Sequence, residues 1–310
     1  MSQKKRIKPP VLLWALLALL LACALLWGLG FLPTTVKPGP HSVPTPTPAP
    51  EPTPDPYRND KAQLDVSDLA QGVVRVRYTG GEDKPIKVQI TKEGGKDYNY
   101  DLNAAGFYET LPFTEGEGAY TLKVLEHKAD KLYTPVYSLE LAVAPESEFA
   151  PFLRPSQFVN YGGAVTTLAA EVMEPGETDA DKTALAFDYV VDHLAYDDDK
   201  AATVEGGYLP DLDDILAEGK GICFDYAALL CAMLRSQNIP CKLLVGDSGD
   251  LYHAWVEVWC ETEGLVDGAV PLAADSWTRL DPTFVSNDER SPFIFSYVTD
   301  DSNYRVQYTY

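Results

Sequence analysis

The stretch GKGICFDYAALLCAML, residues 219–234, decides the fold of this 310-residue chain. Gly219 and Gly221 permit a tight turn before Cys223, and the alanines and leucines that follow predict a helix to about Gln237. A thiol at the start of a helix faces unpaired backbone N–H groups and the positive end of the helix dipole, which favour a thiolate. The same N–H groups can bind an oxyanion.

A second stretch, YHAWVEVWC at residues 252–260, predicts a strand because it is rich in β-branched and aromatic residues. His253 shares one face of that strand with two tryptophans, and an alanine and two valines share the other. We expect the small and β-branched face to pack on the helix behind Cys223, which directs His253 toward the thiol. In a third stretch, SWTRLDPTF at 276–284, Asp281 ends a strand and can accept the second imidazole N–H.

These three stretches resemble the transglutaminase-like superfamily, whose core is a papain-type cysteine–histidine–aspartate site. The family's G-x-G-x-C-x-D-Y-A box is matched at 219–227, its H-A-W-V-E-V strand at 253–258 and its L-D-P-T ending at 280–283. The segment LAYDDD at 194–199 resembles the tyrosine–aspartate segment that precedes the box in family members. The resemblance covers roughly residues 150–300, which is about half of the chain.

The resemblance implies that Cys223 is the nucleophile, His253 the acid–base residue and Asp281 the acid that orients the imidazole. A Cys223 thiolate would attack an amide carbonyl and form a thioester. Water would then complete a hydrolysis, as in a peptidase or deamidase, whereas an amine would complete a cross-linking transfer. We expect no cofactor and no metal, because the acidic clusters at 197–199 and 211–214 lack the glycine-centred loop of a calcium site.

Three other cysteines lie close to this site in the sequence. Cys231 lies on roughly the same helix face as Cys223 and is expected to fill the core. Cys241 starts a strand and is expected to be buried, and Cys260 ends the histidine strand. One pair among these three could oxidise if the domain is extracellular, and the spacing does not decide which.

The predicted fold class is α+β: a transglutaminase-like domain follows a small immunoglobulin-like β-sandwich, with a transmembrane helix at the N-terminus. Period-2 alternation, broken by glycine pairs, predicts five to seven short strands before residue 144. Helices at about 164–172 and 182–194 then precede the strands around His253, which is typical of α+β domains. The predicted parts are a basic tail (1–10), a membrane anchor (11–32), a Pro/Thr-rich linker (33–56), the sandwich (57–147) and the transglutaminase-like domain (148–310).

Residues 11–32 form a run of 22 residues without a charge. A helix of that length spans about 33 Å, enough to cross the ~30 Å hydrocarbon core of a bilayer. Basic residues precede the run, so the rest of the chain is expected outside the cell. A signal peptide cleaved near Ala22-Cys23-Ala24 and a lipoprotein cysteine at Cys23 are the alternatives. The linker after it holds ten of the 24 prolines and is expected to be extended.

The chain carries 46 acidic and 25 basic residues, a formal charge of -21. Such an acidic surface argues against nucleic acid or anionic lipid as the main partner. The sequence therefore predicts a membrane-anchored enzyme that acts on protein or peptide amides at the cell surface. Two alternatives stay open: an envelope-binding protein that uses the same groove without catalysis, and an adhesive protein in which the sandwich is the working part.

Overall fold

The computed structural model describes residues 57–81, 84–288 and 290–310, which fall within one compact unit. The predicted anchor at 11–32 and linker at 33–56 lie outside the described residues, so both stay predictions. Among the described residues, no helix is long and apolar enough to span a bilayer.

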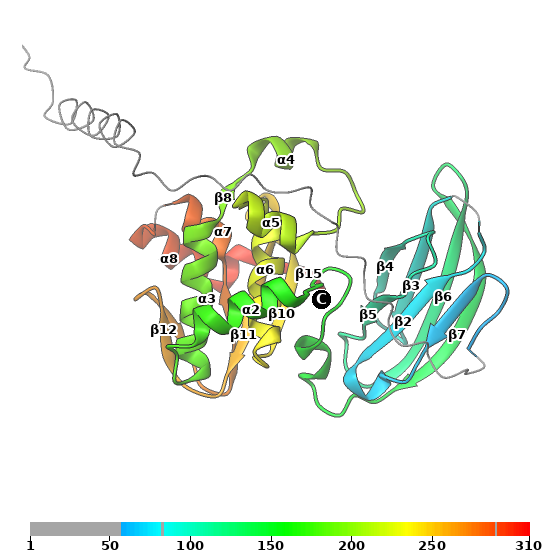
Figure 1. The fold of residues 1–310 in the computed structure, drawn as a ribbon, viewed down its shortest axis with the longest axis horizontal. Coiled ribbons are helices and arrows are strands. Elements are labelled where there is room, and N and C mark those ends of the chain that lie inside the picture. Colours follow the sequence, from blue (N-terminus) through cyan, green and yellow to red (C-terminus); the bar gives the residue numbers. More distant parts are fainter. Residues whose placement is uncertain (1–56, 82–83, 289) are drawn as a thin grey trace, which may run out of the picture. The chain divides into compact units, whose positions relative to one another are not determined.

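Two antiparallel sheets make up the N-terminal part (Figure 1). One sheet has the order β1 (Ala62–Asp65), β2 (Val73–Tyr78), β5 (Glu109–Pro112). The other has the order β4 (Asp97–Leu102), β3 (Ile86–Lys92), β6 (Gly118–Ala129), β7 (Leu132–Val143). Alternate residues of these strands are buried, as the sequence pattern predicts; Val88 and Val124, for example, pair across β3 and β6 and are fully buried. The immunoglobulin-like form of this domain stays a prediction.

Helices, a four-stranded antiparallel sheet and two short strand pairs make up the C-terminal part, which is the predicted α+β arrangement. The sheet has the order β14 (Ser276–Leu280), β11 (Leu251–Cys260), β10 (Cys241–Ser248), β15 (Tyr304–Thr309). The helices are α2 (Gly163–Met173), α3 (Asp179–His193), α4 (Asp198–Thr203), α5 (Leu212–Glu218), α6 (Cys223–Ser236), α7 (Pro282–Asn287) and α8 (Pro292–Thr299). Two-stranded pairs join β8 (Ala195–Tyr196) to β9 (Lys220–Gly221) and β12 (Gly264–Val266) to β13 (Val270–Leu272), and 3-10 turns lie at Leu69–Gln71, Ala150–Leu153 and Asp301–Asn303.

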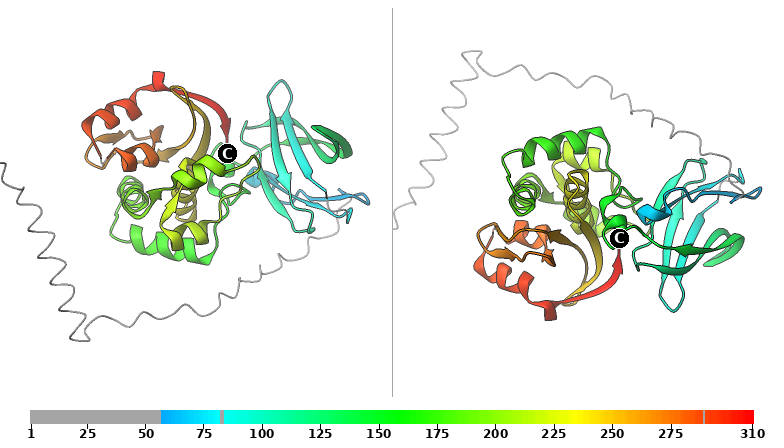
Figure 2. Two further views of the ribbon diagram at one scale, coloured as in Figure 1. Left: turned by 90° about the horizontal axis from the view of Figure 1, so that it is seen from above. Right: turned by 90° about the horizontal axis from the view of Figure 1, so that it is seen from below.

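Helix α6 is the centre of this domain, as Figures 1 and 2 show from three sides. Every residue from Asp225 to Arg235 is buried, because α2, α3, β10 and β11 all pack against the helix. The apolar run AALLCAML suits a helix that is surrounded by protein on all sides. The predicted helix from Cys223 to about Gln237 is therefore confirmed, and its N-terminus opens toward the sheet that carries His253.

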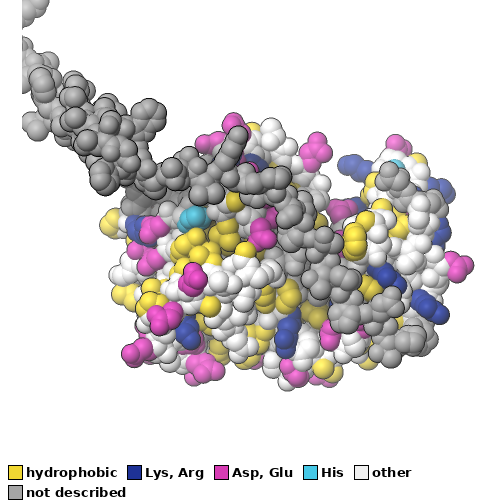
Figure 3. All heavy atoms as spheres, viewed as in Figure 1, with side chains coloured by type: hydrophobic (Ala, Val, Ile, Leu, Met, Phe, Trp, Pro, Cys, Tyr) yellow, Lys and Arg dark blue, Asp and Glu magenta, His cyan; other side chains and the backbone are white. Residues whose placement is uncertain are grey.

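The acidic clusters at 197–199 and 211–214 lie at the starts of two helices. Asp197 caps α4 by accepting the N–H of Lys200, and Asp211 caps α5 by accepting the N–H groups of Asp213 and Asp214. Carboxylates at these positions satisfy N–H groups that have no partner within the helix. Neither helix was expected from the sequence. On the face seen in Figure 3, acidic side chains are scattered among hydrophobic ones.

Candidate active site

Cys223 is the first residue of α6 and is partly exposed. The residue before it, Ile222, is extended, and its backbone N–H donates to Asp225 Oδ2 at 2.9 Å. This contact fixes the turn into the helix and pairs one of its first N–H groups. The N–H of Asp225 donates to the carbonyl of Ile222 at 2.8 Å, and the first N–H groups of a helix in general have no partner further back in it.

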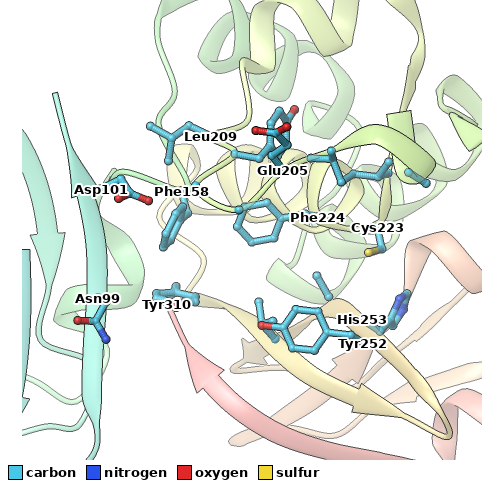
Figure 4. A pocket seen from close by; sticks show the side chains of 18 of the residues that line it. Asn99, Asp101, Phe158, Glu205, Leu209, Cys223, Phe224, Tyr252, His253 and Tyr310 are labelled. Atoms are coloured by element: carbon cyan, nitrogen blue, oxygen red, sulfur yellow. The ribbon is translucent and has the colours of Figure 1, made fainter. Parts of the chain in front are cut away.

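His253 lies on β11, directly opposite Gly246 of β10. The residue is buried, with a side chain that is 5% exposed, and its imidazole stacks against the ring of Phe284 with the ring centroids 4.3 Å apart. Figure 4 shows the His253 ring beside the Cys223 sulfur at one end of a pocket. The structure therefore places the His253 ring next to the thiol, where the sequence analysis expects it.

Asp281 lies just beyond the end of β14, where it begins α7. Its Oδ2 atom accepts a hydrogen bond of 2.8 Å from Nε2 of His253, and its Oδ1 atom accepts the backbone N–H of Phe284 at 3.1 Å. Because Nε2 is used in this contact, Nδ1 of the ring is left for the thiol. The structure thus brings together all three predicted site residues, and Asp281 also caps a helix, which the sequence did not predict.

The electrostatics of the pair favour a protonated imidazole. Burial of His253 opposes its positive charge, but the Asp281 carboxylate and hydrogen bonds with Asp281 and Cys223 outweigh burial and raise the pKa of His253 to about 10. At neutral pH the ring is therefore an imidazolium, which can stabilise a thiolate at Cys223 and can later donate a proton.

Tyr304 is a member of this site that sequence reasoning missed. It lies on β15, at the far edge of the sheet from β14, and its hydroxyl donates to Asp281 Oδ2 at 2.8 Å. The ring packs against Trp255 and under the guanidinium of Arg279, which lies 4.3 Å from the ring centroid. Burial and the adjacent Asp281 carboxylate raise the pKa of Tyr304, so the hydroxyl keeps the proton that it donates.

The pocket in front of Cys223 has a volume of about 590 Å³, which is within the range of substrate sites. Aromatic rings dominate its wall in Figure 4, and Phe158 contacts both Phe224 and Tyr310, with centroids 5.4 and 4.6 Å apart. At the end away from Cys223, Asn99 and Asp101 of β4 also line it. Tyr252, the residue before His253, is 66% exposed at the rim.

One wall of this pocket is formed by residues 204–209, which follow α4. Two side chains, Lys200 and Tyr208, connect this segment to Asp225 in the first turn of α6. Lys200 Nζ lies 2.6 Å from Asp225 Oδ2, and the Tyr208 hydroxyl donates to Asp225 Oδ1 at 2.7 Å. Asp225 is fully buried and has no access to water. Its carboxylate is stabilised instead by these two donors and by the Ile222 N–H. Asp225 is the aspartate of the G-x-G-x-C-x-D-Y-A box, and this aspartate is the one feature of the sequence that points to the contact.

Tyr196 of β8 also lines the pocket. Burial, followed by the nearby Cys223 sulfur, raises the pKa of Tyr196, so its hydroxyl is a proton donor at neutral pH. The parallel pairing of Tyr196 with Gly221 places it beside the turn that precedes Cys223.

The other residues considered in the sequence lie apart from this pocket. Cys231 and Cys241 are buried, as predicted, and Cys260 is also buried and contacts the Thr183 hydroxyl. His193 ends α3, and its ring contacts the carbonyl of Leu216. No group of three or more His, Cys, Asp or Glu side chains within the described residues is placed to hold a metal ion.

Several solved structures resemble this chain at low identity. A candidate cysteine protease from Cytophaga hutchinsonii is 17% identical over 73% of this chain and 68% of its own, with a TM-score of 0.36. The transglutaminase of red sea bream is 13% identical over 68% of this chain and 48% of its own, with a TM-score of 0.30. The fn3 domain of human collagen alpha-1(XX) is 12% identical over 36% of this chain and 97% of its own, with a TM-score of 0.23.

At the level of sequence, no curated protein matches the chain significantly. Residues 166–282 match the family model of the transglutaminase-like superfamily, and this range includes Cys223, His253 and Asp281. Residues 166–282 therefore form a transglutaminase-like domain.

Proposed function

We propose that this protein is a cysteine enzyme that acts on protein or peptide amides through a thioester on Cys223. The observation that carries the proposal is the alignment of three groups: the thiol at the start of α6, the His253 ring beside it, and the 2.8 Å hydrogen bond from that ring to buried Asp281. A reactive thiol, an acid–base group and a carboxylate in this order are sufficient for acyl transfer.

In the first half of the reaction, the Cys223 thiolate attacks the amide carbonyl carbon and a C–S bond forms. The carbonyl oxygen becomes an oxyanion, which can accept the N–H of Cys223 at the start of α6 and the hydroxyl of Tyr196 on the pocket wall. The C–N bond then breaks as His253 gives its proton to the departing amine or ammonia. The products are a thioester and a neutral imidazole.

In the second half, the neutral His253 takes a proton from the incoming nucleophile, which attacks the thioester carbonyl. The C–S bond breaks, the thiolate returns and the imidazolium is restored. Water as the nucleophile gives a carboxylic acid, so the enzyme is a peptidase or deamidase. A primary amine gives a new amide, so the enzyme is a cross-linking transferase.

The proposed place of action is the cell surface. The uncharged run at 11–32 supports a membrane anchor, and the proline-rich residues 33–56 support a spacer of up to roughly 70 Å between the bilayer and the folded domains. The two sheets at 62–143 support an immunoglobulin-like sandwich, and Asn99 and Asp101 give that domain a part in the substrate pocket. Protein or peptide at the surface is the proposed substrate, with no role for nucleic acid.

The reaction can be identified by incubating the full-length protein with a peptide library, with and without an added primary amine, and measuring product masses. Cleavage, deamidation or an amine adduct would each name a different reaction, and Cys223→Ala should abolish all three. The matched control is Cys260→Ala, because Cys260 is buried away from the pocket. Binding of peptides without turnover, and equal labelling of both variants by a thiol-reactive probe, would instead support a non-catalytic binding protein.

A further inference from the structure

Two cysteines outside the proposed site lie against each other. Cys231 is in the second half of α6 and Cys241 is the first residue of β10, and their sulfur atoms are 3.0 Å apart. Both side chains are fully buried. The distance is below the sum of two sulfur van der Waals radii, and an S–S bond of ~2.05 Å needs only about 1 Å of further approach.

The other described cysteines are engaged elsewhere. Cys260 lies 3.6 Å from the Thr183 hydroxyl, and Cys223 faces the pocket beside His253. The sequence alone left three pairings open, and the structure leaves one of them within bonding reach. We propose that Cys231 and Cys241 form a disulfide when the protein folds in contact with an oxidised dithiol of the thiol–disulfide oxidoreductase class. The proposal does not depend on the proposed function.

The chemistry is a two-step exchange. One cysteine thiolate attacks the disulfide of the oxidoreductase, which forms a mixed disulfide and releases one thiolate of that protein. The second cysteine thiolate then attacks the sulfur of the first, closes the 231–241 bond and releases the other thiolate. Two electrons pass to the oxidoreductase, and the two protons of the cysteines are released or taken up by its thiolates.

Burial determines when this exchange can occur. Burial, and then the neighbouring Cys231 thiol, raise the pKa of the Cys241 thiol well above its usual range, so the folded form holds little reactive thiolate. No surface of either residue is open to a protein oxidant after α6 has packed on β10. The bond therefore forms during folding, and the same burial then shields it from reductants in the native state.

The bond would join the two elements that hold the proposed nucleophile and base. Helix α6 begins with Cys223, and β10 is paired with β11, in which His253 lies opposite Gly246. A covalent link at 231–241 would fix the helix against this sheet at the other end of α6. With Cys231 and Cys241 bonded, two of the four described cysteines would keep a free thiol: Cys223, which is partly exposed, and Cys260, which is buried.

Mass spectrometry of the full-length protein tests the proposal, with the protein produced in the periplasm of a bacterial host and, for comparison, in its cytosol. Each sample is denatured with an alkylating reagent but no reductant, and is then digested with trypsin. Cleavage after Lys220, Arg235 and Lys242 gives the peptides 221–235 and 236–242. We expect them to be joined in the periplasmic sample, with one alkylated thiol, and separate in the cytosolic sample.

Peptide 221–235 contains both Cys223 and Cys231, so variants must assign the bond. Cys223→Ala should keep the joined peptides and Cys231→Ala should lose them. The proposal is overturned if Cys231 and Cys241 are both alkylated in the periplasmic protein, or if Cys231→Ala leaves the peptides joined. The wild-type result stands even where a variant does not fold.

Stability gives a second readout. In the periplasmic protein, Cys231→Ala should lower the melting temperature by roughly 5–10 °C relative to Cys260→Ala, as expected for the loss of one disulfide in a domain of this size. Prior reduction under denaturing conditions followed by refolding with excess thiol should remove most of that difference. If the difference in melting temperature between the two variants stayed the same after reduction, it would come from lost core packing, and this result would count against the disulfide.

Discussion

Tyr304 and His253 donate to the same carboxylate oxygen, Oδ2 of Asp281, each at 2.8 Å. The backbone N–H of Phe284 binds the other oxygen, so three donors from β11, β15 and α7 fix one buried side chain. A carboxylate held by several donors cannot rotate away from the imidazole that it orients. This places Tyr304 as a positioning residue, which acts on His253 through Asp281.

Tyr304→Phe tests this role, because it removes the hydroxyl and keeps the ring that packs on Trp255. A hydrogen bond to a charged group contributes about 1.5–3 kcal/mol, and we expect about half of that to appear in the chemical step, a fall in kcat of about 10-fold. KM should change little, since Tyr304 does not line the pocket. The matched control is Tyr308→Phe on the same strand, and equal kcat values for the two variants would contradict the positioning role.

The protonation of His253 should depend on Asp281. Nuclear magnetic resonance of the imidazole should show that His253 stays protonated up to about pH 9, in line with a pKa of about 10. Asp281→Asn removes the charge and should move the midpoint toward the unperturbed value of about 6.5. An unchanged midpoint would show that Asp281 does not hold the proton on the ring.

The same shift predicts how stability varies with pH. Because folding raises the pKa of His253, the native state binds the proton more tightly than the unfolded state. This contribution to stability is complete below about pH 6.5 and is lost as pH rises toward about 10. Urea unfolding from pH 6 to 10 should therefore show a steeper loss in the wild type than in Asp281→Asn.

Lys200 and Asp225 form one ion pair, but substitution of Lys200 should destabilise the protein more than substitution of Asp225. The Lys200 side chain is 27% exposed and can turn to water, whereas Asp225 is fully buried. Lys200→Met leaves a buried carboxylate without its cation and should cost about 3 kcal/mol, near the lower end of the range for broken buried pairs. Asp225→Asn should cost less, about 1–2 kcal/mol, because the amide can still accept the Ile222 N–H. Urea denaturation of the two variants gives the order, and the reverse order would contradict this account.

Gly246 should tolerate no side chain. An added Cβ would overlap the carbonyl of Arg305 and lie 2.9 Å from the nitrogen of Gln307, both in β15. Gly246→Ala should push β15 from the sheet at a cost of about 1–3 kcal/mol, and should lower activity because Tyr304 is on that strand. Gly163→Ala, where an added Cβ meets nothing within 4 Å, is the control for both measurements.

The sequence predicts the parts of this protein that have a local pattern. The alternation of residues 72–143 predicts β2, β3, β4, β6 and β7 but not the short strands β1 and β5, and the run after Cys223 predicts α6. Cys223, His253 and Asp281 could be selected together because each has a distinct local context: a turn into a helix, a strand, and a strand end. Their roles stay proposals, but their proximity agrees with the prediction.

Tyr304 and residues 204–209 could not be found in this way. Tyr304 meets Asp281 only because β15 pairs with β10 in a register that shifts between Val245 and Gly246, and no local pattern gives that register. Helices α4 and α5 are short and acidic, so they lack the apolar periodicity on which helix prediction depends. Their caps, Asp197 and Asp211, are the one signal that would have indicated helix starts.

The carboxylate of Asp225 holds both the turn before Cys223 and, through Lys200 and Tyr208, the segment that walls the pocket. Asp225 therefore holds the turn at Cys223 and the pocket wall at 204–209 at a fixed distance from each other. A covalent inhibitor would place its reactive group at the first of these surfaces and the rest of its structure against the second. Compounds that react with the sulfur can be extended along the aromatic wall toward Asp101 with a rigid scaffold, and their selectivity would come from the fit of that scaffold.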